Sequence, residues 1–445
     1  TVTFDGSSAQ TIAGNITTTA NNDGVLVISN THNNGVTFGG SIGTSGGNKV
    51  GAMNITSTAT FNSTVDATTV DIDTDAGPET VIFGGNVTGG AWTIESGGAG
   101  DTAAVKFRGN ATLTSLNIDK ETAEATVTFD GSSAQTIAGA ITVSTNGDGV
   151  LSIGNTHSSG VTFSGAIGTN GNKIGNLIVE SGTRGNATFN STVDATAADI
   201  DTDGGASTLI FAGDVRGGAW NIETGGSGDT AALNFRGNLT LTSLNLDKET
   251  AEATVTFDGS SGQTIAGNIT ATANGDGTLV VNNSNGVTFS GTIGTSGGNK
   301  VGNLNVRSTA TFSSTVDATA ADIDTDAGSS TVIFTGNVVG GAWNIETGGG
   351  GDTAAVNFRG NLTLTSLNID KETAEATVTF DGSSAQTIAG DITATTNGDG
   401  TLVISNSNGV TFNDDIGTSA RKIGTVNITV ASTFSSTVNA STLDI

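Results

Sequence analysis

The sequence predicts an all-β protein that folds as a parallel β-solenoid, with about 22–24 residues per coil and phenylalanine side chains stacked inside. Three observations lead to this fold class. The chain repeats itself at a long period, its 18 phenylalanines recur at a shorter period, and the residues around each phenylalanine alternate between apolar and polar. Stacked coils account for all three, because each coil places its residues directly above those of the coil before it.

The long repeat is marked by the string TVTFDGSS, which begins at Thr1, Thr126, Thr254 and Thr377. These positions divide the 445 residues into repeats at 1–125, 126–253 and 254–376 and a partial fourth repeat at 377–445. No proline-rich or charged linker separates the copies. We therefore expect residues 1–445 to form one continuous β-solenoid.

The short period comes from the phenylalanines, which lie 22–26 residues apart except for one interval of 32–34 residues in each repeat. Residues near each phenylalanine alternate with a period of two, which is typical of strands with one buried face. Gly, Asn and Asp fill the gaps and favour turns. Each unit of 22–24 residues is expected to hold about three short strands. We interpret the long interval as one coil with an inserted hairpin or loop, and one and a half coils is the alternative.

A tandem array of β-sandwich domains is the competing fold, because repeats of about 125 residues suit Ig-like domains. The inner period, the missing linkers and the unbroken phenylalanine register favour the solenoid. Trp92, Trp220 and Trp343 occupy one equivalent place in the coil, with Ile two residues later, so we expect them in the core. An exposed aromatic row for sugar binding is the alternative for these three residues.

The composition excludes several classes of function. The chain has no Cys, which rules out disulfides, thiolate metal sites and thiol nucleophiles. Fifteen Lys and Arg against 42 Asp and Glu give a net charge of −27, which disfavours nucleic acid and anionic membranes as partners. No apolar run approaches the roughly 20 residues of a membrane helix, so no membrane insertion is expected in this segment.

The coils resemble the passenger repeats of bacterial autotransporter and surface-layer-type proteins. The similarity is to rickettsial outer-membrane autotransporters and giant alphaproteobacterial surface repeat proteins, and it rests on the Gly-, Thr- and Asn-rich segments 35–51, 160–175 and 235–247. The resemblance implies a secreted right-handed β-helix, display at the cell surface and a structural or adhesive role. It implies no catalytic residues.

An acidic motif, Asp-Ile-Asp-Thr-Asp, recurs once in each full repeat. In a strand, the aspartates share the outward face while the isoleucine points inward. Clustered carboxylates bounded by a glycine turn could bind Ca²⁺, which takes six to eight oxygen ligands. A solvated acidic strand without metal is the alternative. The candidate ligands are Asp71, Asp73, Asp75, Asp199, Asp201, Asp203, Asp322, Asp324 and Asp326.

The most charged stretches are the segments 119–124, 247–252 and 370–375. Solvated loops are the simplest interpretation of these segments. The functional alternative is lateral contact with a neighbouring chain, for which Arg108, Arg236 or Arg359 could supply the opposite charge. Single surface pairs contribute only about 0–1 kcal/mol, so such contacts matter only when they are repeated.

The sequence therefore predicts an extracellular structural repeat protein, which forms a stiff acidic rod in a cell-surface layer, fibre or filament. An adhesin stalk that binds host or glycan surfaces is one alternative, and a carbohydrate-active β-helix enzyme is another. We expect no enzyme, because each acidic cluster recurs with the repeat whereas a catalytic site normally occurs once. The expected partners are copies of the chain itself, laterally or end to end, and the unpaired terminal strands would suit a longer chain or end-to-end stacking.

Overall fold

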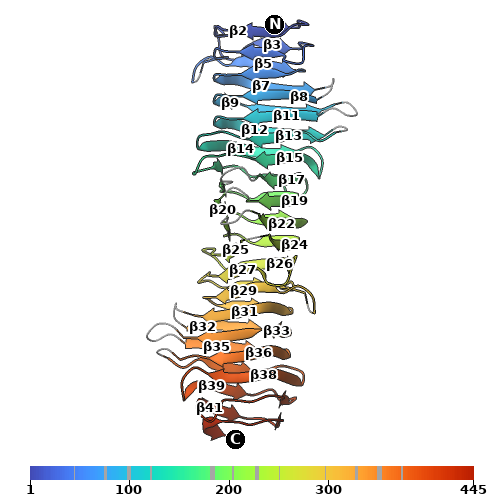
Figure 1. Cartoon of the computed structure of the whole chain (residues 1–445). Helices are drawn as coiled ribbons and strands as arrows, with labels where there is room; N and C mark the ends of the chain where they lie inside the picture. The colour runs from blue at the N-terminus through green and yellow to red at the C-terminus, as the bar shows by residue number, and fades with distance from the viewer. Residues whose placement is uncertain are drawn as a thin grey trace. The chain divides into compact units, whose positions relative to one another are not determined.

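The computed structural model describes residues 1–44, 46–74, 78–97, 102–120, 123–180, 186–202, 205–225, 230–249, 251–295, 297–325, 329–347, 353–371 and 374–445. Within these ranges the chain consists of short strands and turns and contains no helix. Strands at equivalent places in neighbouring coils pair in parallel, as β1 with β3, β3 with β5 and β5 with β7 (Figure 1). The parallel β-solenoid that the sequence predicts is therefore confirmed.

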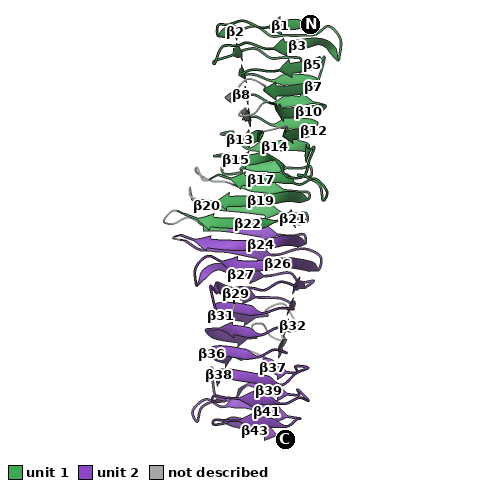
Figure 2. Cartoon of the chain, turned by 90° about the vertical axis from the view of Figure 1, so that its right-hand side faces the viewer, with its two compact units in different colours: residues 1–231 green, residues 232–445 purple. Residues whose placement is uncertain are grey.

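The chain divides into two compact units, residues Thr1–Ala231 and Ala232–Ile445, which Figure 2 colours separately. The strands of the first unit are β1 (Val2–Phe4), β2 (Gln10–Ile12), β3 (Asp23–Ile28), β4 (Val36–Phe38), β5 (Val50–Ile55), β6 (Ala59–Phe61), β7 (Val65–Thr74), β8 (Pro78–Phe83), β9 (Val87–Gly89), β10 (Ala91–Ser96), β11 (Thr102–Phe107), β12 (Ala111–Lys120), β13 (Thr126–Phe129), β14 (Gln135–Val143), β15 (Asp148–Ile153), β16 (Val161–Phe163), β17 (Ile174–Val179), β18 (Ala187–Phe189), β19 (Val193–Asp201), β20 (Ala206–Phe211), β21 (Val215–Gly217) and β22 (Ala219–Thr224).

The boundary between the units falls within β23 (Thr230–Phe235). The strands of the second unit are β24 (Leu239–Lys248), β25 (Ala253–Phe257), β26 (Gln263–Ala271), β27 (Asp276–Val281), β28 (Val287–Phe289), β29 (Val301–Val306), β30 (Ala310–Phe312), β31 (Val316–Asp324), β32 (Ser329–Phe334), β33 (Val338–Gly340), β34 (Ala342–Glu346), β35 (Thr353–Phe358), β36 (Leu362–Ile369), β37 (Thr377–Phe380), β38 (Gln386–Ala394), β39 (Asp399–Ile404), β40 (Val410–Phe412), β41 (Ile423–Ile428), β42 (Ser432–Phe434) and β43 (Ala440–Asp444).

Each coil of the first unit has three sides, and inward side chains on each side form a column, named here A, B or C. Column A runs through Ile12, Phe38, Phe61, Phe83, Phe107, Phe129, Ile153, Val179, Ile200 and Ile222. Column B runs through Ile16, Ile42, Val65, Val87, Ala111, Ile137, Phe163, Phe189 and Phe211. Column C runs through Phe4, Ile28, Ile55, Ile72, Ile94, Ile118 and Val143 and continues from Ile141 to Ile167, Val193 and Val215.

The second unit has the same three-sided construction, with columns named here D, E and F. Column D contains Phe257, Val281, Val306, Ile323, Ile345, Ile369 and Ala394. Column E contains Leu239, Ile265, Phe289, Phe312, Phe334, Phe358, Phe380, Ile404 and Ile428. Column F contains Ile269, Ile293, Val316, Val338, Leu362, Ile388, Phe412 and Phe434.

Aromatic rings fill the interior, as predicted. In column A the rings from Phe38 to Phe129 stack with centroids 5.0–5.5 Å apart, close to the spacing of strands within a sheet. Trp92, Trp220 and Trp343 are at most 1 % exposed, so the prediction that they lie in the core is confirmed. Rings of this size are the largest contributors of buried apolar area to the core.

The phenylalanine stack is divided where the sequence predicts one unbroken register. Phe129 in column A is followed along the chain by Phe163 in column B, and the two rings meet edge to face at 83° with centroids 5.3 Å apart. An edge-to-face contact marks the same change of column between Phe257 and Phe289 in the second unit. We call this change of column the step. The phenylalanines thus advance by one side of the coil at each long interval.

The interpretation of the long interval as one coil with an inserted loop is wrong. From Phe129 the chain passes column B at Ile137, column C at Ile141 and column A at Ile153 before Phe163 enters column B. The interval therefore contains one full coil and one further side, because it holds a strand that ordinary coils lack. We call these strands, β3 and β15 in the first unit and β27 and β39 in the second, the spacer strands.

Replacing Phe211, which is fully buried in column B, with Ala should destabilise the neighbouring coils by about 3–5 kcal/mol through lost burial and a cavity. Coils of a solenoid contact mainly their neighbours, so hydrogen exchange should accelerate only around β20. Phe434→Ala is the matched control, since this ring in β42 is only partly buried and its loss should cost less. Loosening spread evenly over the chain would contradict the prediction.

Candidate functional site

The acidic strands place their side chains as the alternation predicts. Asp71 is exposed at the surface of β7, whereas Ile72 beside it is completely buried in column C. The copies of this pair in β19 and β31 follow the same pattern. Asp75, Asp203 and Asp326 lie outside the described residues, so the structure places six of the nine predicted ligands: Asp71, Asp73, Asp199, Asp201, Asp322 and Asp324.

Further carboxylates lie beside these aspartates on neighbouring strands. Asp73 of β7 is in register with Glu95 of β10, and Glu95 is in register with Asp119 of β12. Like charges directly opposite one another across strands repel. The described residues contain no group of three or more His, Asp or Glu side chains arranged to hold a metal ion. Calcium binding by the acidic strands stays a prediction.

Arginines proposed for lateral contacts pair with carboxylates of their own unit. Arg108 Nε lies 3.3 Å from an Asp130 carboxylate oxygen on the next coil, and Arg359 makes the equivalent contact with Asp381. Arg236 pairs with Asp258 at 3.4 Å. These cations already have intramolecular partners, which weakens their proposed role in binding a neighbouring chain.

A carboxylate that the sequence pattern did not reveal as buried occurs once in each full repeat. Asp66, Asp194 and Asp317 lie near the start of β7, β19 and β31 and are at most 1 % exposed. Lys49 Nζ is 3.4 Å from Asp66 Oδ1, and Lys300 Nζ is 2.6 Å from Asp317 Oδ1. Each lysine belongs to the preceding coil, so these ion pairs fasten one coil to the next.

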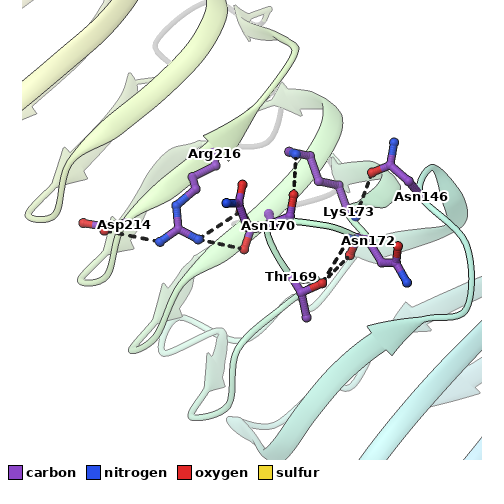
Figure 3. A network of polar contacts seen from close by, with 8 residues as sticks. Asn146, Thr169, Asn170, Asn172, Lys173, Asp214 and Arg216 are labelled. Atoms are coloured by element: carbon purple, nitrogen blue, oxygen red, sulfur yellow. Dashed lines mark hydrogen bonds and ion pairs between the residues drawn. The ribbon is translucent and has the colours of Figure 1, made fainter.

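The copy around Asp194 has a different cation partner. Arg216 Nη1 lies 3.3 Å from Asp194 Oδ2, and Arg216 Nη2 lies 3.4 Å from Asp214 Oδ2. In Figure 3, Arg216 extends toward Asp214, while Lys173 donates instead to the Asn170 carbonyl oxygen at 3.0 Å. Arginine is available only here because the residue in register with Asp66 is Thr88 and its counterpart beside Asp317 is Val339.

Burial raises the pKa of the Asp194 carboxyl above its ordinary value, and the charges of Arg216 and Lys173 only partly oppose this rise. Backbone packing produces the burial. Gly168 has a φ of +67°, and a Cβ at this position would lie 2.3 Å from the Asp194 carbonyl oxygen. Only glycine lets the loop lie this close over the strand.

The fourth repeat carries Asn439 where the other three carry the buried aspartate. Asn439 Nδ2 donates to the Gly417 carbonyl oxygen at 3.3 Å, so a neutral amide also fits beneath this loop. A sequence signal for the site does exist: an Asp between two apolar residues at the start of a strand, 17–21 residues after a lysine. Nothing in that pattern reveals that the carboxylate is buried.

The chain matches no known protein family, no curated protein and no solved structure. The described part of the chain also lacks any helix with the length and hydropathy needed to cross a membrane. Functional conclusions about the chain therefore depend on its own geometry and chemistry.

Asp194→Asn should stabilise the protein at neutral pH, because the substitution removes a buried charge whose desolvation outweighs its attraction to nearby cations. The folded-state pKa of Asp194 exceeds its unfolded value, so wild-type stability rises as the pH falls through the folded-state pKa. The advantage of the variant should shrink over that window, by about 1.4 kcal/mol for each unit by which the folded-state pKa exceeds the unfolded one. Denaturant unfolding at several pH values measures the effect.

Asp214→Asn is the matched control for this substitution. It removes a more exposed carboxylate that contacts the same arginine, and its effect should stay within about 0.5 kcal/mol at every pH. If Asp194→Asn is less stable than wild type at neutral pH and keeps the wild-type pH dependence, the account of this carboxylate is wrong.

Calcium should raise the melting temperature of the protein, because a bound cation offsets repulsion between carboxylates and stabilises the folded state. Calorimetry with Ca²⁺ and with chelator, at matched ionic strength in sodium salt, separates binding from screening. The calcium effect should diminish in the triple variant Asp71→Asn, Asp199→Asn, Asp322→Asn. Identical melting temperatures with calcium and with chelator would contradict calcium binding by these strands.

Proposed function

We propose that the chain is an extracellular structural repeat protein whose stacked coils form a stiff acidic rod in a cell-surface layer, fibre or filament. One observation carries the proposal. In each unit, continuous columns of apolar side chains fill the interior, while most polar features of the described surface, such as the pairs Arg108–Asp130 and Arg359–Asp381, recur with the repeat. Such an arrangement suits a function that depends on length, stiffness and repeated surface.

The number and variety of contacts between neighbouring coils support the proposed stiffness of the rod. Parallel backbone pairing links each coil to the next, and aromatic stacking in columns A and E follows the same axis as this pairing. Ion pairs such as Lys49–Asp66 and Lys300–Asp317 add cross-links between neighbouring coils. Bending a coil stack of this kind would separate several kinds of contact at once.

Charge supports a role for cations in assembly. The chain has 42 acidic against 15 basic residues, and many described Lys and Arg side chains already pair with carboxylates of their own unit. Two such chains repel each other when they approach side by side. We therefore propose that copies of the chain associate laterally only where cations, Ca²⁺ among them, neutralise their surfaces.

Electron microscopy of the native material tests the proposed function. We expect fibres, bundles or a layer, and diffraction from oriented material should give a reflection near 4.8 Å along the long axis of the rods. Chelator and low salt should loosen lateral association without unfolding the coils. Native material that consists only of dispersed single chains, with or without calcium, would contradict the structural role.

A further inference from the structure

The spacer strands share a construction that is not found in the described parts of the ordinary coils. Each begins at an aspartate within Asn-Gly-Asp-Gly, or within Asn-Asn-Asp-Gly in the first copy. In the second unit the Asp276 carboxylate accepts a hydrogen bond from the Ala273 backbone N–H at 2.6 Å. Gly277 follows with a φ of +73°, where a Cβ would lie 2.3 Å from Leu246 Cδ1. The turn that begins the spacer strand is therefore specified by its own residues.

A buried amide pair closes the corner beside the spacer strand. Three residues separate Phe235 from Leu239 at an ordinary corner, whereas seven separate Phe257 from Ile265 at the step. Gln263 bridges the two corners, since its Nε2 donates to the carbonyl oxygens of Phe235 and Gly237 at 2.8 and 2.9 Å.

The next coil is tied to the same glutamine. Asn283 Nδ2 donates to Gln263 Oε1 at 2.8 Å and to the Ser261 carbonyl oxygen at 2.7 Å, and both amides are at most 4 % exposed. Gln386 and Asn406 form the same bonds at the following step. The buried amide groups at this wider corner therefore have hydrogen-bond partners, as buried polar groups in stable proteins generally do.

We propose that the spacer strand is a phase-setting element, which turns the repeat by one side of the coil. Three sides of the coil between phenylalanines keep each ring above the last, and a fourth side, formed by the spacer strand, moves the next ring to the adjacent column. Outward residues of the repeat move to the adjacent side together with the phenylalanines. Asp71 lies on the side of column C, whereas its copy Asp199 lies on the side of column A. Equivalent surface features of successive repeats therefore point in different directions within one unit.

Excision of a spacer strand tests this element. Deleting residues 274–281 shortens the interval from Phe257 to Phe289 from 32 to 24 residues, a spacing that ordinary coils already use. The phenylalanine column should then run straight, with Thr256 beside Thr288. In the intact chain Thr256 is in register with Val280. Neighbouring strands bring Cα atoms within the range that a disulfide requires.

Engineered cysteine pairs report the register directly, because the chain has no cysteine of its own. The intact chain should oxidise the pair T256C/V280C and leave T256C/T288C at least about tenfold less oxidised. The deletion variant should oxidise T256C/T288C instead. The pair T311C/I333C, in register in the second unit, should form equally in both chains and serves as the control.

A second deletion keeps the test decisive if the first variant folds poorly. Removing residues 397–404 makes the same change between Phe380 and Phe412, near the end of the chain, and T379C/T411C then reports the register. The proposal is overturned if T256C/T288C forms in the intact chain. It is also overturned if a folded deletion variant does not form its new disulfide, or if both deletions unfold the coils beyond the junction.

Discussion

The rest of the structure depends on one constraint, the in-register stacking of coils one strand spacing apart. Backbone pairing fixes this spacing, so every inward side chain must pack against its counterpart in the next coil. Ring centroids about 5 Å apart in column A satisfy that requirement without changing the backbone. Aliphatic residues can enter the same column, as Ile153 does above Phe129, so a column continues where the phenylalanines leave it.

This tolerance explains which parts of the fold the sequence predicts. The spacing of the phenylalanines and the alternation around them were sufficient for the coil, its length and its buried tryptophans. They were insufficient for the step, because Leu151-Ser152-Ile153 has the alternation of any strand but carries no phenylalanine to mark its column. Counting phenylalanines therefore left out the spacer strands. Pairings such as Phe129 with Ile153 and Phe257 with Val281 reveal them.

The two candidate sites, the exposed acidic strands and the buried aspartates, also differ in how far the sequence predicts them. Outward placement of Asp71 follows from the alternation within one strand, which the sequence displays. Burial of Asp194 depends on a loop from the preceding coil and an arginine from the following coil, so it is a property of three coils together. Local pattern cannot supply such information, because Asp66 and Asp317 have almost the same flanking residues and yet take lysine as their partner.

The step also determines how charge is distributed over each unit. If every repeat had the same phase, the acidic motif would always occupy one side, and the other sides would be free to approach a neighbour. Because each spacer strand turns the coil, Asp71 and Asp199 lie on different sides of the first unit. Asp322 and Asp444, which is the corresponding aspartate of the partial fourth repeat, lie on different sides of the second. Within each unit the acidic motif therefore occupies two sides of the coil instead of one, so an approaching chain meets this negative charge from more than one direction.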